Sequence, residues 1–283
     1  MTHPQILIII LNYNTYELTL SMIEELKKLD YSYYNILVVD NNSPNNSGEI
    51  LSRKSSEDNS YIFIQNDKNV GYAAGNNIGL RYAVEHGYKY SWVINNDILI
   101  KDSKVLSHMI TILEEHPEYA GVGPMIYTLD NHICGPFCNR PTPFSMTLGI
   151  GIDLKYRKSQ INTSRPVYRL FGCCMLLDNE TMKQVDYLDE RTFLYCEEDI
   201  LAERVLKVGK TFYYDSNVSI KHMESSSLRY SVIKLKTNIK YVIDSRNIYM
   251  KEYRNWNCVI RFLVNTTYAL KRYYRNAKRN RKI

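Results

Sequence analysis

Residues 89–100 read KYSWVINNDILI, and this stretch decides the fold that we expect for the rest of the chain. Residues 92–94 form an apolar run that is typical of a strand buried on both faces of a parallel sheet. The run ends at Asn95-Asn96-Asp97, which would lie at the carboxyl edge of that sheet, where open α/β folds bind their ligands. Asp97 could bind Mg²⁺ or Mn²⁺ there, with phosphate oxygens and water as the other ligands. A simple Asn-Asn-Asp turn between two strands is the alternative.

The composition predicts an ordinary soluble protein of 283 residues, with 45% hydrophobic and 23% charged residues. This length suits one large α/β domain, alone or with an appendage. We expect no secretory signal and no membrane span, because no stretch approaches about 20 apolar residues. The six cysteines are scattered, which favours free thiols in a reducing cytoplasm. His132, Cys134 and Cys138 lack the second cysteine pair of a structural zinc site.

The first 40 residues have the pattern of a βαβ unit with a right-handed crossover. Its expected strand, helix and strand are residues 5–11, 15–29 and 35–39. Thr15 occupies the N-cap position of the helix. Asn12 and Asn14 follow the first strand and Asp40 follows the second, so Asn12 and Asp40 should lie level with Asp97 at the sheet edge.

Small residues open the helix that we expect after a third strand at residues 61–65. Gly71, Gly75 and Gly79 recur every fourth residue, which differs from the dinucleotide-binding fingerprint. Small side chains permit close approach of the backbone, and N–H groups at a helix N-terminus favour an anion. The alternative is a small-residue helix that merely packs close to the sheet.

Several patterns follow in the second part of the chain. Residues 106–161 should form a helix followed by loops and short strands over one face of the sheet. Residues 169–177, RLFGCCMLL, have the pattern of a strand. Glu197-Glu198-Asp199 then crowd the first turn of a helix. These acids either complement the helix dipole, or one of them is a base with a pKa raised by its neighbours.

The end of the chain is helical and basic. Two helical patterns, at residues 228–253 and 256–283, follow His222, and a lone histidine is more often structural than a ligand. Seven basic residues and no acidic one lie from Lys271 to the end, so most of the net charge of +6 is concentrated there. The rest of the chain has no matching basic face with aromatic residues, so we do not expect nucleic-acid binding.

The order of these features resembles the family-2 glycosyltransferases, in particular the rhamnosyltransferase-like subgroup. The resemblance covers roughly residues 5–250 and is carried by NVGYAAGNNIG, WVINNDI, FLYCEEDILAERVLKVG and IKHMESSS. It implies a GT-A fold, which is a Rossmann-like, mostly parallel central sheet flanked by helices. The GT-A catalytic domain would span residues 1–225, with a nucleotide-binding half to about residue 100 and an acceptor-binding half after it. Residues 226–283 would form a C-terminal helical extension with a basic tail.

The resemblance also implies an activity. It predicts an inverting hexosyl- or deoxyhexosyltransferase that moves a sugar from a UDP- or dTDP-sugar to a hydroxyl of a glycan acceptor. That acceptor would be linked to polyprenyl diphosphate, in the synthesis of bacterial surface polysaccharide.

Donor-binding residues follow from the resemblance by position. Asn12 and Asn14 would lie beside the nucleotide, and Asp40 would accept a hydrogen bond from the imide N–H of the pyrimidine base. Asn69 and Gly71 would line the diphosphate-sugar site, and so would Asn76.

Metal ligands follow in the same way. Asn95-Asn96-Asp97 matches the DXD position of the family, with Asn95 in place of the first aspartate. Asp97 and His222 would therefore hold Mn²⁺ or Mg²⁺, while Asn95 and Asn96 would contact the nucleotide sugar.

The catalytic base would come from the acidic motif at residues 197–199. In the family the motif reads Glu-Asp, followed by leucine and arginine. Alignment on Leu201 and Arg204 places the base at Glu198, the residue we favour, whereas alignment on the letters Glu-Asp selects Asp199. Inversion in one step requires such a carboxylate to accept the proton of the acceptor hydroxyl. A divalent cation and helix N–H groups would stabilise the departing diphosphate.

Two other functions compete with this prediction. A sugar-phosphate nucleotidyltransferase would need a glycine-rich basic loop after the first strand, which residues 12–15 do not provide. A non-catalytic nucleotide-sugar-binding or membrane scaffold protein stays open because of Asn95.

The last helix is expected to hold the protein peripherally on the cytoplasmic face of the membrane. Its apolar residues share one helical face, with basic residues beside and beyond it. These apolar positions are Val259, Phe262, Leu263, Thr266, Leu270 and Tyr273 or Tyr274. The alternative is a helix packed on the α/β domain with a solvated basic tail.

Overall fold

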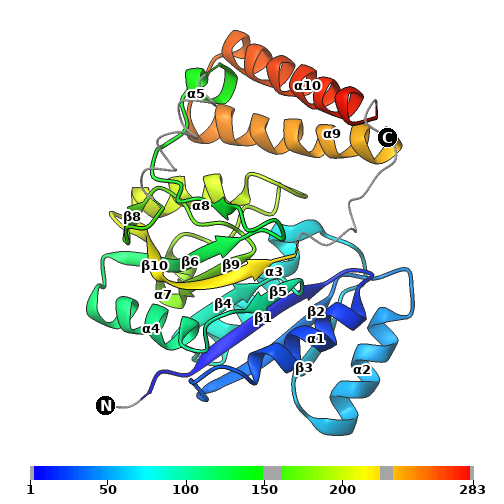
Figure 1. Cartoon of the computed structure of the whole chain (residues 1–283), viewed down its shortest axis with the longest axis vertical. Helices are drawn as coiled ribbons and strands as arrows, with labels where there is room; N and C mark the ends of the chain where they lie inside the picture. The colour runs from blue at the N-terminus through cyan, green and yellow to red at the C-terminus, as the bar shows by residue number, and fades with distance from the viewer. Residues whose placement is uncertain (1–2, 149–160, 224–231, 281–283) are drawn as a thin grey trace.

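The computed structural model describes residues 3–148, 161–223 and 232–280. Its centre is a ten-stranded mixed sheet with the order β3-β2-β1-β4-β9-β6-β10-β5, to which β7 and β8 add at β6 and β10 (Figure 1). The strands are β1 (Ile6–Asn12), β2 (Tyr34–Asp40), β3 (Ile62–Gln65), β4 (Tyr90–Ile94), β5 (Ile98–Ile100), β6 (Tyr119–Tyr127), β7 (Ile133–Cys134), β8 (Arg165–Val167), β9 (Cys174–Asp178) and β10 (Thr211–His222).

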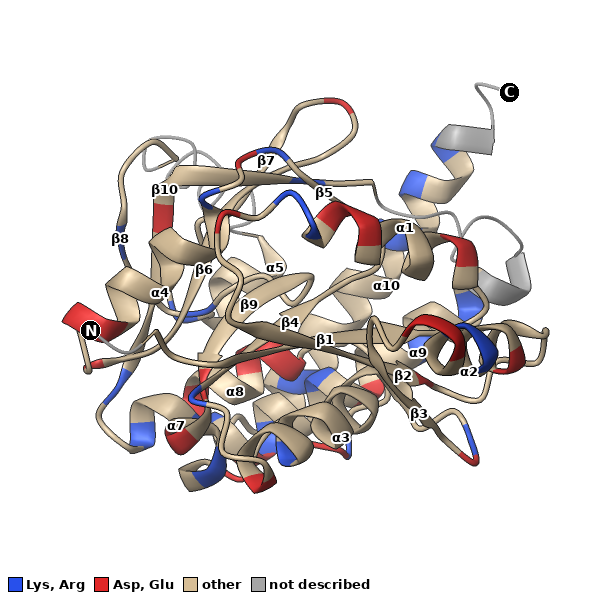
Figure 2. Cartoon of the chain, turned by 90° about the horizontal axis from the view of Figure 1, so that it is seen from below, with Lys and Arg blue, Asp and Glu red and all other residues tan. Residues whose placement is uncertain are grey.

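Helices cover both faces of this sheet, which Figure 2 shows nearly edge-on. Helices α1, α2 and α4 pack on one face, and α3, α7 and α8 pack on the other. The described helices are α1 (Tyr16–Leu26), α2 (Ser47–Asp58), α3 (Gly71–Glu85), α4 (Val105–Glu115), α5 (Pro143–Thr147), α7 (Asn179–Gln184), α8 (Glu197–Lys207), α9 (Val232–Ile248), the π-helix η2 (Tyr249–Tyr253) and α10 (Cys258–Asn280).

The apolar run of β1 explains why this fold forms. Ile6, Ile8 and Ile10 face one layer of helices, and Leu7 and Ile9 face the other. All five side chains are fully buried, as a strand covered on both faces requires. Strands β1 to β4 pair in parallel, so the predicted α/β fold with a central sheet flanked by helices is confirmed.

The second half of the sheet differs from its expected outline. β9 runs antiparallel between β4 and β6 and begins only at Cys174, so residues 169–173 form a loop and not the start of a strand. β6 is a nearly fully buried core strand of nine residues, where we expected loops and short strands. Gly121 explains the difference, because a Cβ there would lie 2.6 Å from the backbone oxygen of Leu176. The glycines that suggested a loop let two strands pack closely.

Helices α9 and α10 lie side by side above one end of the sheet domain (Figure 1). A small core joins them to α8 through Ile200, Tyr249, Met250 and Val264. The predicted C-terminal helices are therefore present. The segment before them, residues 224–231, and residues 281–283 lie outside the described residues, so the domain boundary near residue 225 stays a prediction. None of the helices in the described part of the chain is both long and apolar enough to cross a membrane.

Candidate active site

The carboxyl ends of β1, β2 and β4 bring the predicted polar residues to one edge of the sheet. Asn12 is directly opposite Asp40 in the parallel register of β1 and β2. The Asn96 side chain donates to the hydroxyls of Thr15 and Thr19, each at 2.9 Å, which places the end of β4 beside the loop after β1. Thr15 is at the N-cap position of α1, although its side chain makes no capping hydrogen bond.

Asp40 is fully buried and organises the loop after β2. Its Oδ1 accepts from Asn12 Nδ2 and from the Ser43 hydroxyl, both at 2.6 Å. Its Oδ2 accepts from the Ser43 N–H and from Gln65 Nε2, both at 2.9 Å. Both carboxylate oxygens are thus engaged, and the recognition of a pyrimidine imide by Asp40 stays a prediction. Asn14 has a buried Oδ1 for which the described residues offer no donor, so it could accept from a nucleotide.

Asn41 was not singled out in the sequence, yet it orders the loop before α3. Its Nδ2 donates to Asn69 Oδ1 at 2.9 Å and to the Gly71 carbonyl at 3.1 Å. Its Oδ1 accepts from Asn66 Nδ2 and from the Val70 N–H. Asn69 is therefore held in the loop where we expected the diphosphate-sugar site.

Gly71 joins this loop to the segment that precedes the acidic helix. Its φ of +84° favours glycine, and a Cβ there would lie 2.3 Å from the Phe193 carbonyl oxygen. The next residue, Tyr72, donates its N–H to that same oxygen at 2.8 Å. Asn76 is buried, and its amide donates to the Tyr72 carbonyl one helical turn earlier.

Asp97 and His222 form the pair that the sequence predicted as metal ligands. His222 Nε2 lies 3.1 Å from Asp97 Oδ1, and both side chains are largely buried. Antiparallel pairing of β10 with β5 produces this contact, with His222 opposite Ile98. Asn95 and Asn96 contribute no charge beside them, and no three His, Cys, Asp or Glu side chains gather into a metal centre among the described residues. The pair fits a divalent cation that takes two protein ligands, because a carboxylate oxygen and an imidazole nitrogen converge.

The three acids at the start of α8 have three different environments. Burial and the adjacent Glu198 raise the pKa of Glu197 well above its ordinary value. Glu198 is half-buried, and its Oε1 accepts from the Gly172 N–H at 3.0 Å. Asp199 Oδ1 lies 3.0 Å from Arg169 Nε in an ion pair. Glu198 is thus the acid of the three that is partly accessible and forms no direct ion pair in the described part of the chain.

Gly172 lies between the acids and the Asp97–His222 pair, in the loop that we had expected to be a strand. A Cβ on Gly172 would lie 2.7 Å from Glu198 Oε1. Its carbonyl accepts from the Tyr72 hydroxyl at 2.5 Å, and the next carbonyl, that of Cys173, accepts from the Asn95 N–H at 2.9 Å. A glycine beside two cysteines was the available sequence signal, but it predicts no particular role.

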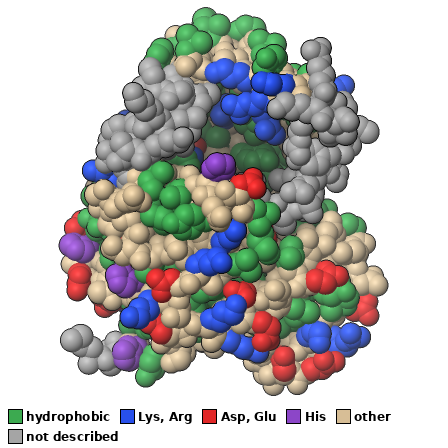
Figure 3. All heavy atoms as spheres, viewed as in Figure 1, with side chains coloured by type: hydrophobic (Ala, Val, Ile, Leu, Met, Phe, Trp, Pro, Cys, Tyr) green, Lys and Arg blue, Asp and Glu red, His purple; other side chains and the backbone are tan. Residues whose placement is uncertain are grey.

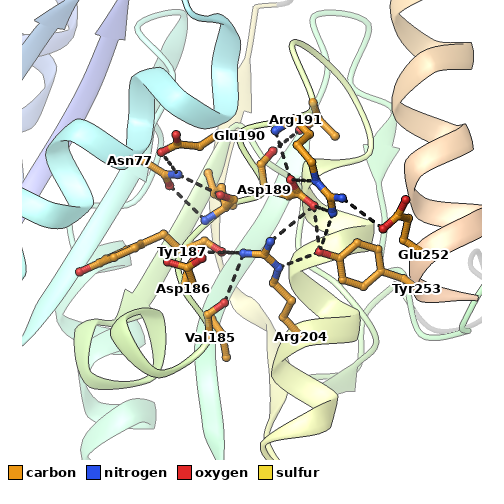
Figure 4. Close-up of polar contacts among 12 residues, drawn as sticks. Asn77, Val185, Asp186, Tyr187, Asp189, Glu190, Arg191, Arg204, Glu252 and Tyr253 are labelled. Atoms are coloured by element: carbon orange, nitrogen blue, oxygen red, sulfur yellow. Dashed lines mark hydrogen bonds and ion pairs between the residues drawn. The ribbon is translucent and has the colours of Figure 1, made fainter.

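Arg204 fixes α8 in place, as Figure 4 shows. It donates to three successive backbone carbonyls, those of residues 185–187, and to the Tyr253 hydroxyl at 3.0 Å. Asp189 joins the network by accepting from Arg191 and Tyr253. Although burial opposes its charge, the hydrogen bonds from Arg191 and Tyr253 lower the pKa of Asp189 to about 2. The arginine of the predicted acidic motif therefore positions the helix.

The sequence of the chain is similar to those of known glycosyltransferases. The family model described as "Glycosyl transferase family 2" matches residues 7–170. The hexosyltransferase Agl10 of low-salt glycan biosynthesis from Haloferax volcanii is 29% identical over 163 residues, which are 57% of this chain and 50% of that protein. The galactofuranosyltransferase GlfT1 from Mycobacterium tuberculosis is 23% identical over 155 residues, 53% of this chain and 48% of that protein. The chain spans about half the length of these curated relatives.

Solved structures share the fold at low sequence identity. The mannosyltransferase PcManGT from Pyrobaculum calidifontis, in complex with GDP-Man and Mn²⁺, has a TM-score of 0.62 and 14% identity, covering 95% of this chain and 70% of its own. GalNAc-T7 with UDP, GalNAc and Mn²⁺ has a TM-score of 0.63 and 12% identity, covering 89% and 49%. TarS 1–349 of S. aureus with UDP-GlcNAc has a TM-score of 0.57 and 14% identity, covering 89% and 74%. The family model covers more than half of the sequence, and the chain therefore belongs to glycosyl transferase family 2.

Proposed function

We propose that this chain is a metal-dependent, inverting glycosyltransferase that moves a sugar from a UDP- or dTDP-sugar to a hydroxyl of a glycan acceptor. One observation carries the proposal: the loop at residues 171–173 contacts both functional groups. The Phe171 ring packs edge-on against His222, and the Gly172 N–H binds Glu198. The Asp97–His222 pair and the Glu198 carboxylate therefore both adjoin one short loop, which supports the proposal.

The chemistry assigns a role to each group. Glu198 accepts the proton of the acceptor hydroxyl as that oxygen attacks the anomeric carbon. Asp97 and His222 would hold Mn²⁺ or Mg²⁺, which supplies positive charge for the departing diphosphate. The reaction needs one base. Arg169 neutralises Asp199 and Glu197 is buried, which leaves Glu198 for this role.

The proposal of a pyrimidine donor rests on the sheet edge around Asp40 and Asn14, and on the resemblance to the rhamnosyltransferase-like subgroup. Solved neighbours were captured with different donors, GDP-Man in PcManGT and UDP-GlcNAc in TarS. The fold alone therefore does not select the nucleotide.

The acceptor proposal is a lipid-linked glycan in bacterial surface polysaccharide synthesis, with the enzyme peripherally attached to the cytoplasmic face of the membrane. Exposed apolar side chains on α10 support it. Phe262, Leu263 and Leu270 are 68%, 54% and 65% exposed. In Figure 3, hydrophobic side chains cap the molecule at the end where α10 lies. Val264 is fully buried, so α10 packs on the domain with one face and presents the other outward.

A thermal-shift screen of UDP-, dTDP- and GDP-sugars with Mn²⁺, Mg²⁺ or EDTA tests the donor, because selective binding stabilises the fold. We expect metal-dependent stabilisation by a UDP- or dTDP-sugar, followed by its slow hydrolysis in the absence of acceptor. Stabilisation by GDP-sugars alone would refute the pyrimidine assignment. Binding without any hydrolysis or transfer would favour a non-catalytic nucleotide-sugar-binding protein.

A further inference from the structure

A polar seam runs between α9 and α10, above the acidic helix. Arg261, Asn265, Tyr268 and Arg272 recur on one face of α10 at helical spacing. Asn265 Nδ2 donates to Asn247 Oδ1 of α9 at 2.9 Å. The guanidinium carbon of Arg246, also on α9, lies 4.3 Å from the centre of the Tyr268 ring. The face of α10 opposite its exposed apolar residues is thus lined with arginines.

These arginines have more donors than the seam has acceptors. Among the described residues, the buried atoms Arg246 Nη1, Arg261 Nε and Arg272 Nε have no hydrogen-bond partner, and neither does the buried acceptor Asn265 Oδ1. No carboxylate among the described residues forms an ion pair with any of the three arginines. A buried polar group without a partner is costly, and a buried cation more so. The seam therefore offers guanidinium donors to an anion that binds from outside.

The seam adjoins the residues that lead into the acidic helix. Ser245 Oγ of α9 donates to the Leu194 carbonyl at 2.9 Å, and Tyr241 stacks on Phe193 at 4.6 Å between ring centres. The charge of Arg246 opposes the rise that burial causes in the pKa of Cys196, the residue before α8. The charge of Arg272 in turn opposes the rise that burial causes in the pKa of Tyr195. An anion in the seam would therefore lie near the start of the acidic helix.

Figure 3 shows the same arrangement on the surface. Basic side chains form the upper wall of a hollow between the helical pair and the sheet domain, and a histidine and acidic side chains lie on its lower rim. Residues 232–280 contain twelve Lys or Arg and two acidic residues, although the net charge of the whole chain is only +6. The positive charge of the protein is therefore concentrated on the element that overhangs the candidate active site.

We propose that Arg246 and Arg272, assisted by Arg261, bind the diphosphate group of the acceptor substrate. This inference rests on the proposed glycosyl transfer to a lipid-linked acceptor. Guanidinium groups bind phosphate oxygens in a bidentate manner and favour such sites over lysine. A diphosphate in the seam would supply the missing acceptors. Its sugar would lie toward the acidic helix, and its lipid chain would leave the seam and pass around α10 to the exposed apolar residues on the far face of that helix.

The test uses two double variants of the full chain with equal loss of charge. R246Q/R272Q removes one seam arginine from α9 and one from α10, whereas R275Q/K278Q removes two exposed cations from α10. Binding of decyl diphosphate and of inorganic pyrophosphate is measured by calorimetry in EDTA, which excludes a contribution from a metal-dependent donor site. Hydrolysis of the nucleotide sugar with metal is measured separately.

We expect R246Q/R272Q to weaken decyl diphosphate binding at least tenfold, with unchanged donor hydrolysis. R275Q/K278Q should stay within about twofold of the natural chain. Equal weakening in both double variants, or in neither, would overturn the proposal. Equally tight binding of inorganic pyrophosphate would overturn the acceptor assignment in favour of a free diphosphate. Decyl diphosphate binding needs no turnover, so failure of the glycosyltransferase proposal would be visible separately, as absence of donor hydrolysis.

If R246Q/R272Q does not fold, the single variant Arg246→Lys retains the charge and loses the bidentate geometry. We expect weaker decyl diphosphate binding in that variant too, and unchanged binding would count against the proposal.

Discussion

Arg169 Nε lies 3.0 Å from Asp199 Oδ1, and both side chains are only 18% exposed. This ion pair separates two adjacent acids between which the sequence favoured Glu198 and left Asp199 as the alternative. Asp199 pairs with a buried cation, whereas Glu198 accepts only a backbone N–H from Gly172 among the described residues. The pair therefore leaves Glu198 as the candidate base.

Glu198→Gln should lower sugar transfer by orders of magnitude while donor affinity stays close to that of the natural chain, because only the proton acceptor is lost. Asp199→Asn should instead lower the melting temperature, since a largely buried Arg169 loses its charge partner at a cost of about 1–3 kcal/mol. Transfer kinetics and thermal melts of the two variants provide the measurement. Full activity in Glu198→Gln with none in folded Asp199→Asn would move the catalytic role by one residue.

Gly172→Ala should reduce kcat with little change in donor binding. Its Cβ would lie 2.7 Å from Glu198 Oε1, so the carboxylate would have to move away from the acceptor hydroxyl. Gly87→Ala is a suitable control, because a Cβ there meets nothing within 4 Å, although its φ of +75° imposes some strain. Equal kcat values in Gly172→Ala and the natural chain would show that the Glu198 position is not limiting.

Glu197→Gln should stabilise the protein at neutral pH. Burial raises the pKa of Glu197 above its ordinary value of 4.5. Its contribution to stability is therefore fully present below about pH 4.5 and is lost as the pH rises through the raised pKa. The advantage of the glutamine variant should grow between pH 5 and pH 8, as measured by melting curves at both pH values. A constant difference across this range would mean that folding does not raise the pKa of Glu197.

Asp97→Ala should abolish metal-dependent nucleotide binding, because His222 alone is a poor site for Mn²⁺ or Mg²⁺. EDTA should have the same effect on the natural chain. Calorimetric titration of UDP with and without metal gives the comparison, and Asp130→Ala, at an exposed position between β6 and β7, serves as the control. Turnover that survives EDTA would contradict the metal assignment.

Replacement of Phe262, Leu263 and Leu270 by serine should weaken binding to anionic vesicles in a flotation assay, because these exposed side chains would insert into the lipid. The exposed residues Tyr33, Leu129 and Leu148 give a matched control when changed to serine. Binding should also fall with added salt, since the basic residues of α10 contribute to it. Equal flotation of both triple variants, or no binding by the natural chain at low salt, would remove the membrane proposal.

The parts of the fold that could be predicted are those whose sequence pattern depends only on the segment itself. The strands of the first half were predictable because helices cover both faces, so their sequences are continuous apolar runs. β6 was missed because its glycines serve strand packing, and residues 169–173 were taken for a strand because a buried loop can be equally apolar.

The candidate site was predictable to the same extent. Asp97, His222 and the acidic turn could be located by their order along the chain. The different environments of Glu197, Glu198 and Asp199 could not, because they depend on Arg169 and Gly172, which lie some 30 residues away. The hydrogen bonds of Asp40 are equally dependent on residues from other loops.

The bond from the Tyr72 N–H to the Phe193 carbonyl limits how this enzyme could be recombined with its relatives. A chimera that joins its first 100 residues to a foreign second half would place a new backbone against Gly71, where there is no room for displacement. A grafted second half would then be accompanied by a distorted loop at residues 69–71. Swaps that transfer residues 69–77 together with residues 171–199 keep both sides of this contact, and they define the smallest portable unit of the candidate site.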